Sequence, residues 1–167
     1  MGLPAVVAAV LLLLGACRDV PVVEPVQQPV DQLKENRINA NRLVAQSEEN
    51  QIDAYVSRRG WQMQRLSGGG RVMVTDEGGG SKIDYEDTVA IVYSVETLGG
   101  VLLYSNVADT VVAGRMQPTR GLDQAIRTMR RGSTAYVVLP SEQGYGVIGD
   151  GDRIGTRTVL VYKVKIK

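Results

Sequence analysis

Hydrophobic residues recur at every second position in several segments of the chain. Residues 160–167 show this pattern most clearly, because apolar side chains on one face alternate with lysines on the other. Residues 71–75 and 88–96 alternate in the same way, and residues 134–139 form an apolar run. A period of two is typical of β-strands. The two glycines at 99–100 predict a hairpin turn into a further strand at 101–105.

Two other segments carry the period of a helix. Apolar residues at i, i+3, i+4 and i+7 from Leu122 predict a short helix that Gly132 ends. Residues 48–59 predict a second helix, with Ser47 as its N-cap. Residues 31–46 are polar with weak periodicity and are compatible with helix or disorder. The order of elements predicts an α+β fold, in which a twisted antiparallel sheet wraps on one short helix and carries an N-terminal helical extension.

The first residues predict export. Residues 6–14 form an apolar run that is shorter than the about 20 residues a bilayer crossing takes, and it is typical of a signal peptide. The run ends in Leu14-Gly15-Ala16-Cys17, which resembles the lipobox of bacterial lipoproteins. That resemblance implies a diacylglycerol on Cys17, a membrane anchor and a cell-envelope location facing the periplasm or the cell surface. A plain signal peptide or a mis-assigned start, with an incidental cysteine, is the alternative interpretation.

Changes in composition predict four segments. Prolines recur at every fourth position from residue 21 to residue 29 and favour extended backbone. We therefore expect a signal peptide at 1–16, a lipidated cysteine and Pro-rich tether at 17–30, a helical extension at 31–66 and a globular domain at 67–167.

Composition excludes several kinds of chemistry. The 19 Lys and Arg residues balance 18 Asp and Glu residues, which argues against a nucleic-acid partner. The chain has no histidine and a single cysteine, so catalytic triads, His-based metal sites and Cys-rich metal sites are not expected. The GxGxxG pattern at 144–149 is not followed by a helical pattern, so it does not predict a nucleotide site. We expect no metal and no cofactor.

Residues 84–167 resemble the FKBP-type peptidyl-prolyl cis-trans isomerase family. The resemblance lies in the order of several motifs, and the N-terminal helix and lipobox are similar to the gliding-motility-associated lipoprotein branch. The motifs are Val89-Ala90-Ile91-Val92-Tyr93, Arg120-Gly121-Leu122, Leu139-Pro140-Ser141, Gly144-Tyr145-Gly146 and the closing strand at 159–164.

This resemblance implies the residues of an apolar proline pocket. The implied catalytic residues are Tyr93, Tyr145 and Tyr162. Several positions depart from the family pattern: Tyr104 stands where aspartate is usual, and Asp109 falls near an aromatic position. The implied substrate-binding residues are Leu103, Tyr104, Pro118, Thr119, Leu122, Ile148 and Ile154.

The resemblance further implies an activity that fits the composition. An isomerase of this family rotates X-Pro bonds without a nucleophile, metal or cofactor, and its partners would be proline-containing polypeptides. Together with the export signal, this predicts an enzyme that assists the folding of envelope proteins. Two alternatives remain open: a binding or chaperone module that keeps the fold without the catalysis, and a structural envelope lipoprotein.

Overall fold

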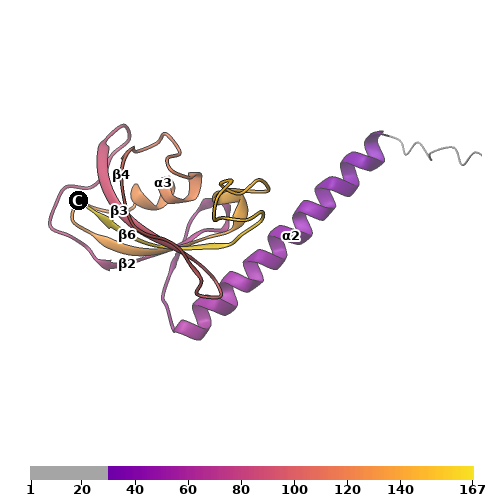
Figure 1. The fold of residues 1–167 in the computed structure, drawn as a ribbon, viewed down its shortest axis with the longest axis horizontal. Coiled ribbons are helices and arrows are strands. Elements are labelled where there is room, and N and C mark those ends of the chain that lie inside the picture. The colour runs from indigo at the N-terminus through magenta and orange to yellow at the C-terminus, as the bar shows by residue number, and fades with distance from the viewer. Residues whose placement is uncertain (1–29) are drawn as a thin grey trace, which may run out of the picture. The chain divides into compact units, whose positions relative to one another are not determined.

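The computed structural model describes residues 30–167 (Figure 1). The expected signal peptide, the lipidation of Cys17 and the Pro-rich tether lie outside the described residues. The chain divides into two units, Met1–Asn36 and Arg37–Lys167, and the second contains the fold described below. Among residues 30–167, no helix combines the length and apolar character needed to cross a membrane.

Six strands form a single antiparallel sheet with the order β1-β2-β5-β6-β3-β4. The predicted α+β architecture is confirmed. A short helix, α3 (Arg120–Ile126), connects β4 to β5, and a 3-10 helix, η3 (Ser141–Gln143), follows β5. The strands are β1 (Gln64–Arg65), β2 (Arg71–Asp76), β3 (Thr88–Thr97), β4 (Leu102–Val112), β5 (Thr134–Leu139) and β6 (Leu160–Ile166), and a 3-10 helix, η2 (Ser67–Gly69), precedes β2.

Two elements extend beyond their predicted bounds. The first helix, α2, spans Val30–Arg59, so Ser47 lies inside the helix and is not its N-cap. No glycine or proline interrupts residues 31–59, and the many Gln, Glu, Arg and Ala residues there favour helix even without an apolar stripe. Strand β4 continues past residue 105. Its pairing with β3 shifts register near Asn106, which has φ +51°, and beyond this shift the inward and outward side chains alternate again.

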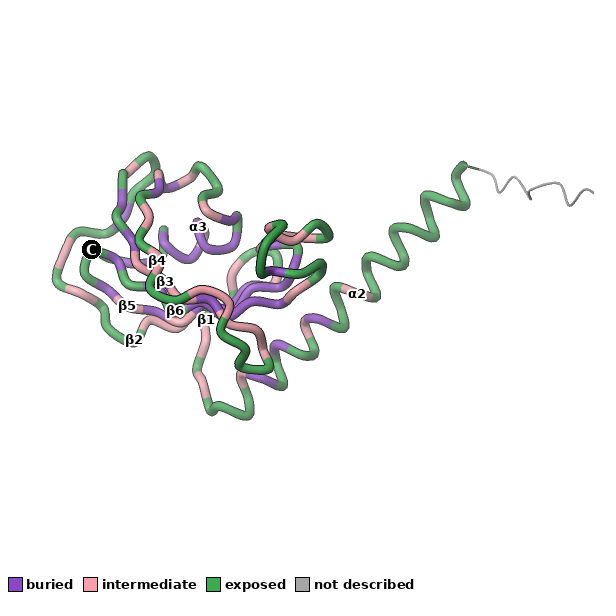
Figure 2. The backbone as a smooth tube through the Cα atoms, viewed as in Figure 1, coloured by how far each residue is buried: buried purple, intermediate pink, exposed green. Residues whose placement is uncertain are grey.

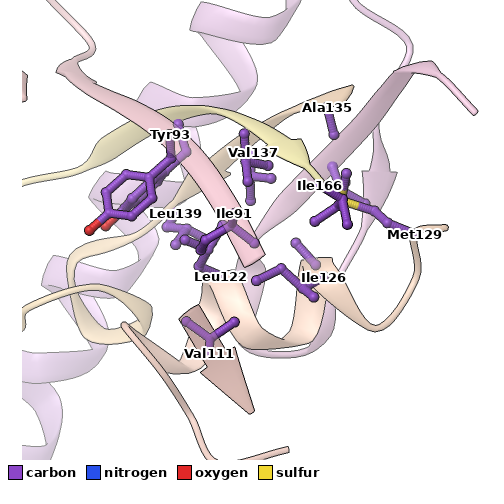
Figure 3. Close-up of a cluster of buried hydrophobic side chains, with 14 of the residues drawn as sticks. Ile91, Tyr93, Val111, Leu122, Ile126, Met129, Ala135, Val137, Leu139 and Ile166 are labelled. Carbon is purple, nitrogen blue, oxygen red and sulfur yellow. The ribbon is translucent and has the colours of Figure 1, made fainter. Parts of the chain in front are cut away.

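The main hydrophobic core lies between the sheet and α3. Leu122 and Ile126 of α3 are fully buried against inward-facing residues of β3, β5 and β6. Figure 3 shows the Tyr93 ring at one side of this cluster, with its hydroxyl pointing away from the aliphatic side chains. The tyrosine hydroxyl therefore marks the edge of the core, where a polar group can meet a ligand.

The C-terminal half of α2 packs on the opposite face of the sheet. Ile52 and Tyr55 are buried against Val138 of β5 and Val161 of β6, which alternate with residues of the main core. Figure 2 shows buried positions along this half of α2. Arg71 of β2 is buried, and its guanidinium forms ion pairs with two α2 carboxylates, at 2.7 Å in one case and 3.5 Å in the other. The sheet thus has a helix on each face, and the candidate site lies at one end of the α3 side.

Candidate active site

The three tyrosines implied as catalytic come from three different elements and meet at one edge of the core. Tyr93 lies on β3 and Tyr162 on β6, where their strands are directly paired. Their ring centroids are 5.8 Å apart at an interplanar angle of 53°. Tyr145 lies in the loop after η3 and is half-buried against the same core cluster. The structure therefore brings all three rings together.

The Tyr162 hydroxyl has an unusual environment. The Tyr162 side chain is fully buried, and its hydroxyl makes no hydrogen bond of good geometry among the described residues, although the Tyr145 and Thr119 hydroxyls lie close to it. Burial raises the pKa of Tyr162, and the nearby Tyr145 adds to the rise while the Thr119 hydroxyl opposes it. Burial likewise raises the pKa of Tyr93 and of Tyr145. All three phenols therefore stay protonated at neutral pH, as hydrogen-bond donors.

The start of α3 forms another part of the site. Thr119 is buried and caps the helix, because its hydroxyl accepts a hydrogen bond of 3.3 Å from the Leu122 backbone N–H. Leu122 follows within the first turn and is fully buried in the core. Pro118 precedes the cap and is half-buried. Their proposed contacts with a substrate stay predictions.

The rim of the site is a polar network that the sequence did not reveal. The Tyr104 hydroxyl on β4 donates a hydrogen bond to the Asp150 carboxylate, and this bond raises the pKa of Tyr104 to about 12. Arg153 places its guanidinium 5.2 Å from the Tyr104 ring centroid and donates a 3.1 Å hydrogen bond to the Leu103 carbonyl. The tyrosine at the position where the family usually has aspartate thus joins β4 to the loop that follows η3.

Backbone N–H groups of the loop that contains Asp150 hold its carboxylate in place. The Asp150 carboxylate accepts backbone hydrogen bonds from Ile154 at 2.8 Å and from Asp152 at 3.0 Å. Desolvation would raise the pKa of Asp150, but these bonds and the Tyr104 hydroxyl outweigh it and lower the pKa. Ile154 is buried in the main core. Ile148 is 83% exposed and lies outside that core, and its substrate contact stays a prediction.

Two cavities lie elsewhere in the molecule. One cavity, of about 500 Å³, lies between α2 and the loop after η3 and is lined in part by Val44, Ile52 and Pro140. Another of about 370 Å³ lies between α2 and the β3–β4 turn, next to Thr158. Neither is lined by Tyr93, Tyr145 or Tyr162. Residues 30–167 also contain no group of three or more acidic or cysteine side chains placed to hold a metal ion.

Comparison with known proteins agrees with the geometry. The model of the family described as FKBP-type peptidyl-prolyl cis-trans isomerase matches residues 79–167, which is more than half of the chain. A probable FKBP-type isomerase, FkpA, from Neisseria meningitidis serogroup B is 27% identical over 95 residues, which cover 56% of this chain and 35% of that protein. The match thus spans about a third of that relative's length.

Solved structures share the fold. A peptidyl-prolyl cis-trans isomerase from Pseudomonas syringae superposes with a TM-score of 0.62 at 23% identity, covering 75% of this chain and 92% of its own. FkpA from Escherichia coli superposes with a TM-score of 0.61 at 19% identity, covering 81% of this chain and 67% of its own. The family match, the shared fold and the meeting of the three tyrosines at one end of the sheet agree: the chain belongs to the FKBP-type peptidyl-prolyl cis-trans isomerase family.

Proposed function

We propose that this protein is a peptidyl-prolyl cis-trans isomerase that acts on X-Pro bonds of polypeptides. The observation that carries the proposal is the grouping of Tyr93, Tyr145 and Tyr162 at one edge of the core, with a buried Tyr162 hydroxyl that makes no hydrogen bond of good geometry. A buried hydroxyl without a well-formed hydrogen bond costs about 1–3 kcal/mol, and a peptide carbonyl that reached it after the covering side chains moved would remove that cost. The family to which the chain belongs supports the same reaction.

The reaction needs no covalent step from the protein. Rotation about an X-Pro bond breaks amide resonance across a barrier of about 18–20 kcal/mol, and unassisted turnover takes tens to hundreds of seconds. The planar amide is more polar than the twisted one, so an apolar wall favours the twisted form relative to the planar one. The rings of Tyr93 and Tyr145, which keep some exposure at the edge of the core that contains Leu122, would supply apolar surface of this kind.

The phenol hydroxyls would also favour the twisted amide over the planar one. A carbonyl that turns away from water during rotation loses its solvent hydrogen bonds, and a fixed donor that it reaches only when turned replaces them. Tyr145 and Tyr162 are both protonated at neutral pH, because their pKa values are raised. We assign them to hold the substrate carbonyls while the X-Pro bond rotates, with Tyr93 as part of the wall.

A peptide isomerisation assay tests the activity. The purified protein should accelerate the cis-to-trans relaxation of a Leu-Pro peptide, and Tyr145→Phe should lower kcat/KM because it removes one donor. Tyr136→Phe is the matched control, since Tyr136 lies outside the site and packs on Trp61. No acceleration over the uncatalysed rate would reject the enzyme. Suppression of client aggregation without acceleration would instead support the binding-module alternative.

We further propose that the protein is a lipid-anchored member of the family that assists the folding of exported envelope proteins. The supporting observation is the Leu14-Gly15-Ala16-Cys17 motif after an apolar run. Two acyl chains on the mature cysteine would give stable anchoring, whereas one gives only marginal binding. Mass spectrometry should detect a diacylglyceryl group on Cys17, and Cys17→Ser should move the protein from the membrane fraction to the soluble fraction. An unmodified cysteine in membrane-associated protein would reject the anchor.

A further inference from the structure

A carboxylate lies in the wall of the candidate site. Asp109 sits on β4 between Val107 and Val111, which both contribute to the main core. Because side chains alternate along a strand, Asp109 points to the same face as these two valines. Its partner across the β3–β4 pair is Ile91, which is fully buried in that core. Asp109 is therefore an acidic residue on the inward face of the sheet, and it is half-buried.

No cation neutralises this carboxylate within the described part of the chain. Its one hydrogen bond is accepted from the backbone N–H of Thr110 at 2.7 Å, and it forms no ion pair among residues 30–167. Its strand partner Ile91 lies two residues before Tyr93 on the same face of β3, and the Asp109 charge adds to the rise in the pKa of both Tyr93 and Tyr145. Asp109 thus stands at the site with unused hydrogen-bonding capacity.

The rim adds negative charge to the same region. Asp150 contacts the Tyr104 hydroxyl, and Asp152 lies within 3.4 Å of that hydroxyl as well. The cation of this loop, Arg153, is already engaged, because its guanidinium pairs with Asp152 at 3.6 Å and donates to the Leu103 carbonyl. The edge of the site therefore has three carboxylates and one committed guanidinium. Such a surface attracts cationic peptides and repels anionic ones.

We propose that Asp109 is a specificity-determining residue that selects X-Pro segments with lysine or arginine next to the proline. The inference rests on the proposed isomerase function and names the substrate class of that site. An ammonium or guanidinium beside the bound proline completes the hydrogen bonding of Asp109, whereas a glutamate there faces an unpaired like charge. Half-buried charge-assisted hydrogen bonds exceed exposed ion pairs in strength, so the expected preference for lysine over glutamate is about 5- to 20-fold.

Two series of otherwise identical peptides test this inference with the full chain. One series places Lys, Leu or Glu immediately before the proline, and the other places them immediately after it. The wild-type protein should show a Lys-to-Glu ratio of kcat/KM well above one in at least one series. Asp109→Asn should bring that ratio close to one, while Asp84→Asn, a change at an exposed turn, should leave it unaltered. A ratio of rates on one sample does not depend on the folded fraction.

Binding of the same peptides, followed by the NMR shifts of the tyrosine rings, separates this inference from the proposed function. If no peptide is isomerised, the enzyme proposal fails, and the Lys-to-Glu ratio of Kd values still measures charge selection. Equal wild-type ratios in both series, or a lysine preference that Asp109→Asn retains, would overturn the assignment. A ratio that shrinks as salt increases would support it, because screening weakens an attraction between charges.

Discussion

Replacing Tyr162 by phenylalanine changes one atom at the centre of the candidate site. The side chain is fully buried, and its hydroxyl lacks a partner among the described residues. The phenyl ring keeps its packing in the core and its tilted contact with Tyr93 at 5.8 Å. The substitution therefore isolates the hydroxyl, and stability and activity should move in opposite directions.

The free energy of unfolding should rise. Removing an unsatisfied buried hydroxyl removes a cost of about 1–3 kcal/mol, but the small gap left by the oxygen loses van der Waals contacts and offsets part of this gain. We expect a net stabilisation of about 1 kcal/mol, which corresponds to a rise in Tm of roughly 3–5 °C for a domain of this size. Thermal unfolding followed by circular dichroism measures this change.

The isomerase rate should fall. A hydrogen bond that forms only when the substrate carbonyl has turned contributes about 0.5–1.5 kcal/mol, so its loss lowers kcat/KM by about 2- to 13-fold. The assay follows relaxation of a Leu-Pro peptide at several enzyme concentrations. Because the variant is expected to be more stable than the wild type, unfolding does not explain a lower rate.

Two results would refute this reasoning. A lower Tm would mean that the hydroxyl already has a partner in the free protein, and an unchanged kcat/KM would mean that it does not meet the substrate. Tyr136→Phe controls for the general effect of removing a phenol oxygen, because its ring packs on Trp61 at 4.7 Å on the other face of the sheet.

Three further outcomes are expected. Glu48→Ala should lower the free energy of unfolding in urea by about 2 kcal/mol, because the Glu48 carboxylate accepts hydrogen bonds from the Ser141 N–H and hydroxyl at 2.9 and 2.6 Å. Gly149→Ala should destabilise the protein more than Gly146→Ala in the same titration; both glycines have positive φ, but only at 149 would a Cβ collide with a backbone carbonyl. Tyr104 should ionise near pH 12 in an NMR titration, so its contribution to stability is present below pH 10 and is lost as the pH rises from about 10 to 12.

The sheet was predictable because its strands carry a strong local signal. The residues of β6 alternate between core and lysine, and β3 repeats the pattern, so both strands were placed from the sequence within one or two residues. The far part of β4 was missed, because the register shift near Asn106 breaks the alternation. The first half of α2 was left open for a related reason: its residues are exposed, so no apolar stripe marks the helix.

The candidate site was only partly predictable. Tyr93, Tyr145 and Tyr162 were named from the family motifs, and the structure brings their rings together. The contact between Tyr104 and Asp150 joins residues 46 positions apart, and neither residue belongs to a motif that implies the other. A tyrosine in place of the usual aspartate was the one available signal. The partner of this tyrosine could not be predicted, because it depends on where the loop after η3 approaches β4, and only the folded chain shows this.

The position of the unsatisfied hydroxyl argues for a site rather than for a defect of packing. Among the described residues, three buried side-chain oxygens lack a partner, and two of them are amide oxygens, of Gln124 and Gln143. The third, of Tyr162, is the only one that can donate a hydrogen bond, and it is the one that lies beside two other phenols. Phenylalanine would fill the same volume without the cost, so packing alone gives no reason for the oxygen. Under the proposed function, a ligand carbonyl would supply the reason, because it would convert the unpaired donor into binding free energy at the place where an X-Pro bond would turn.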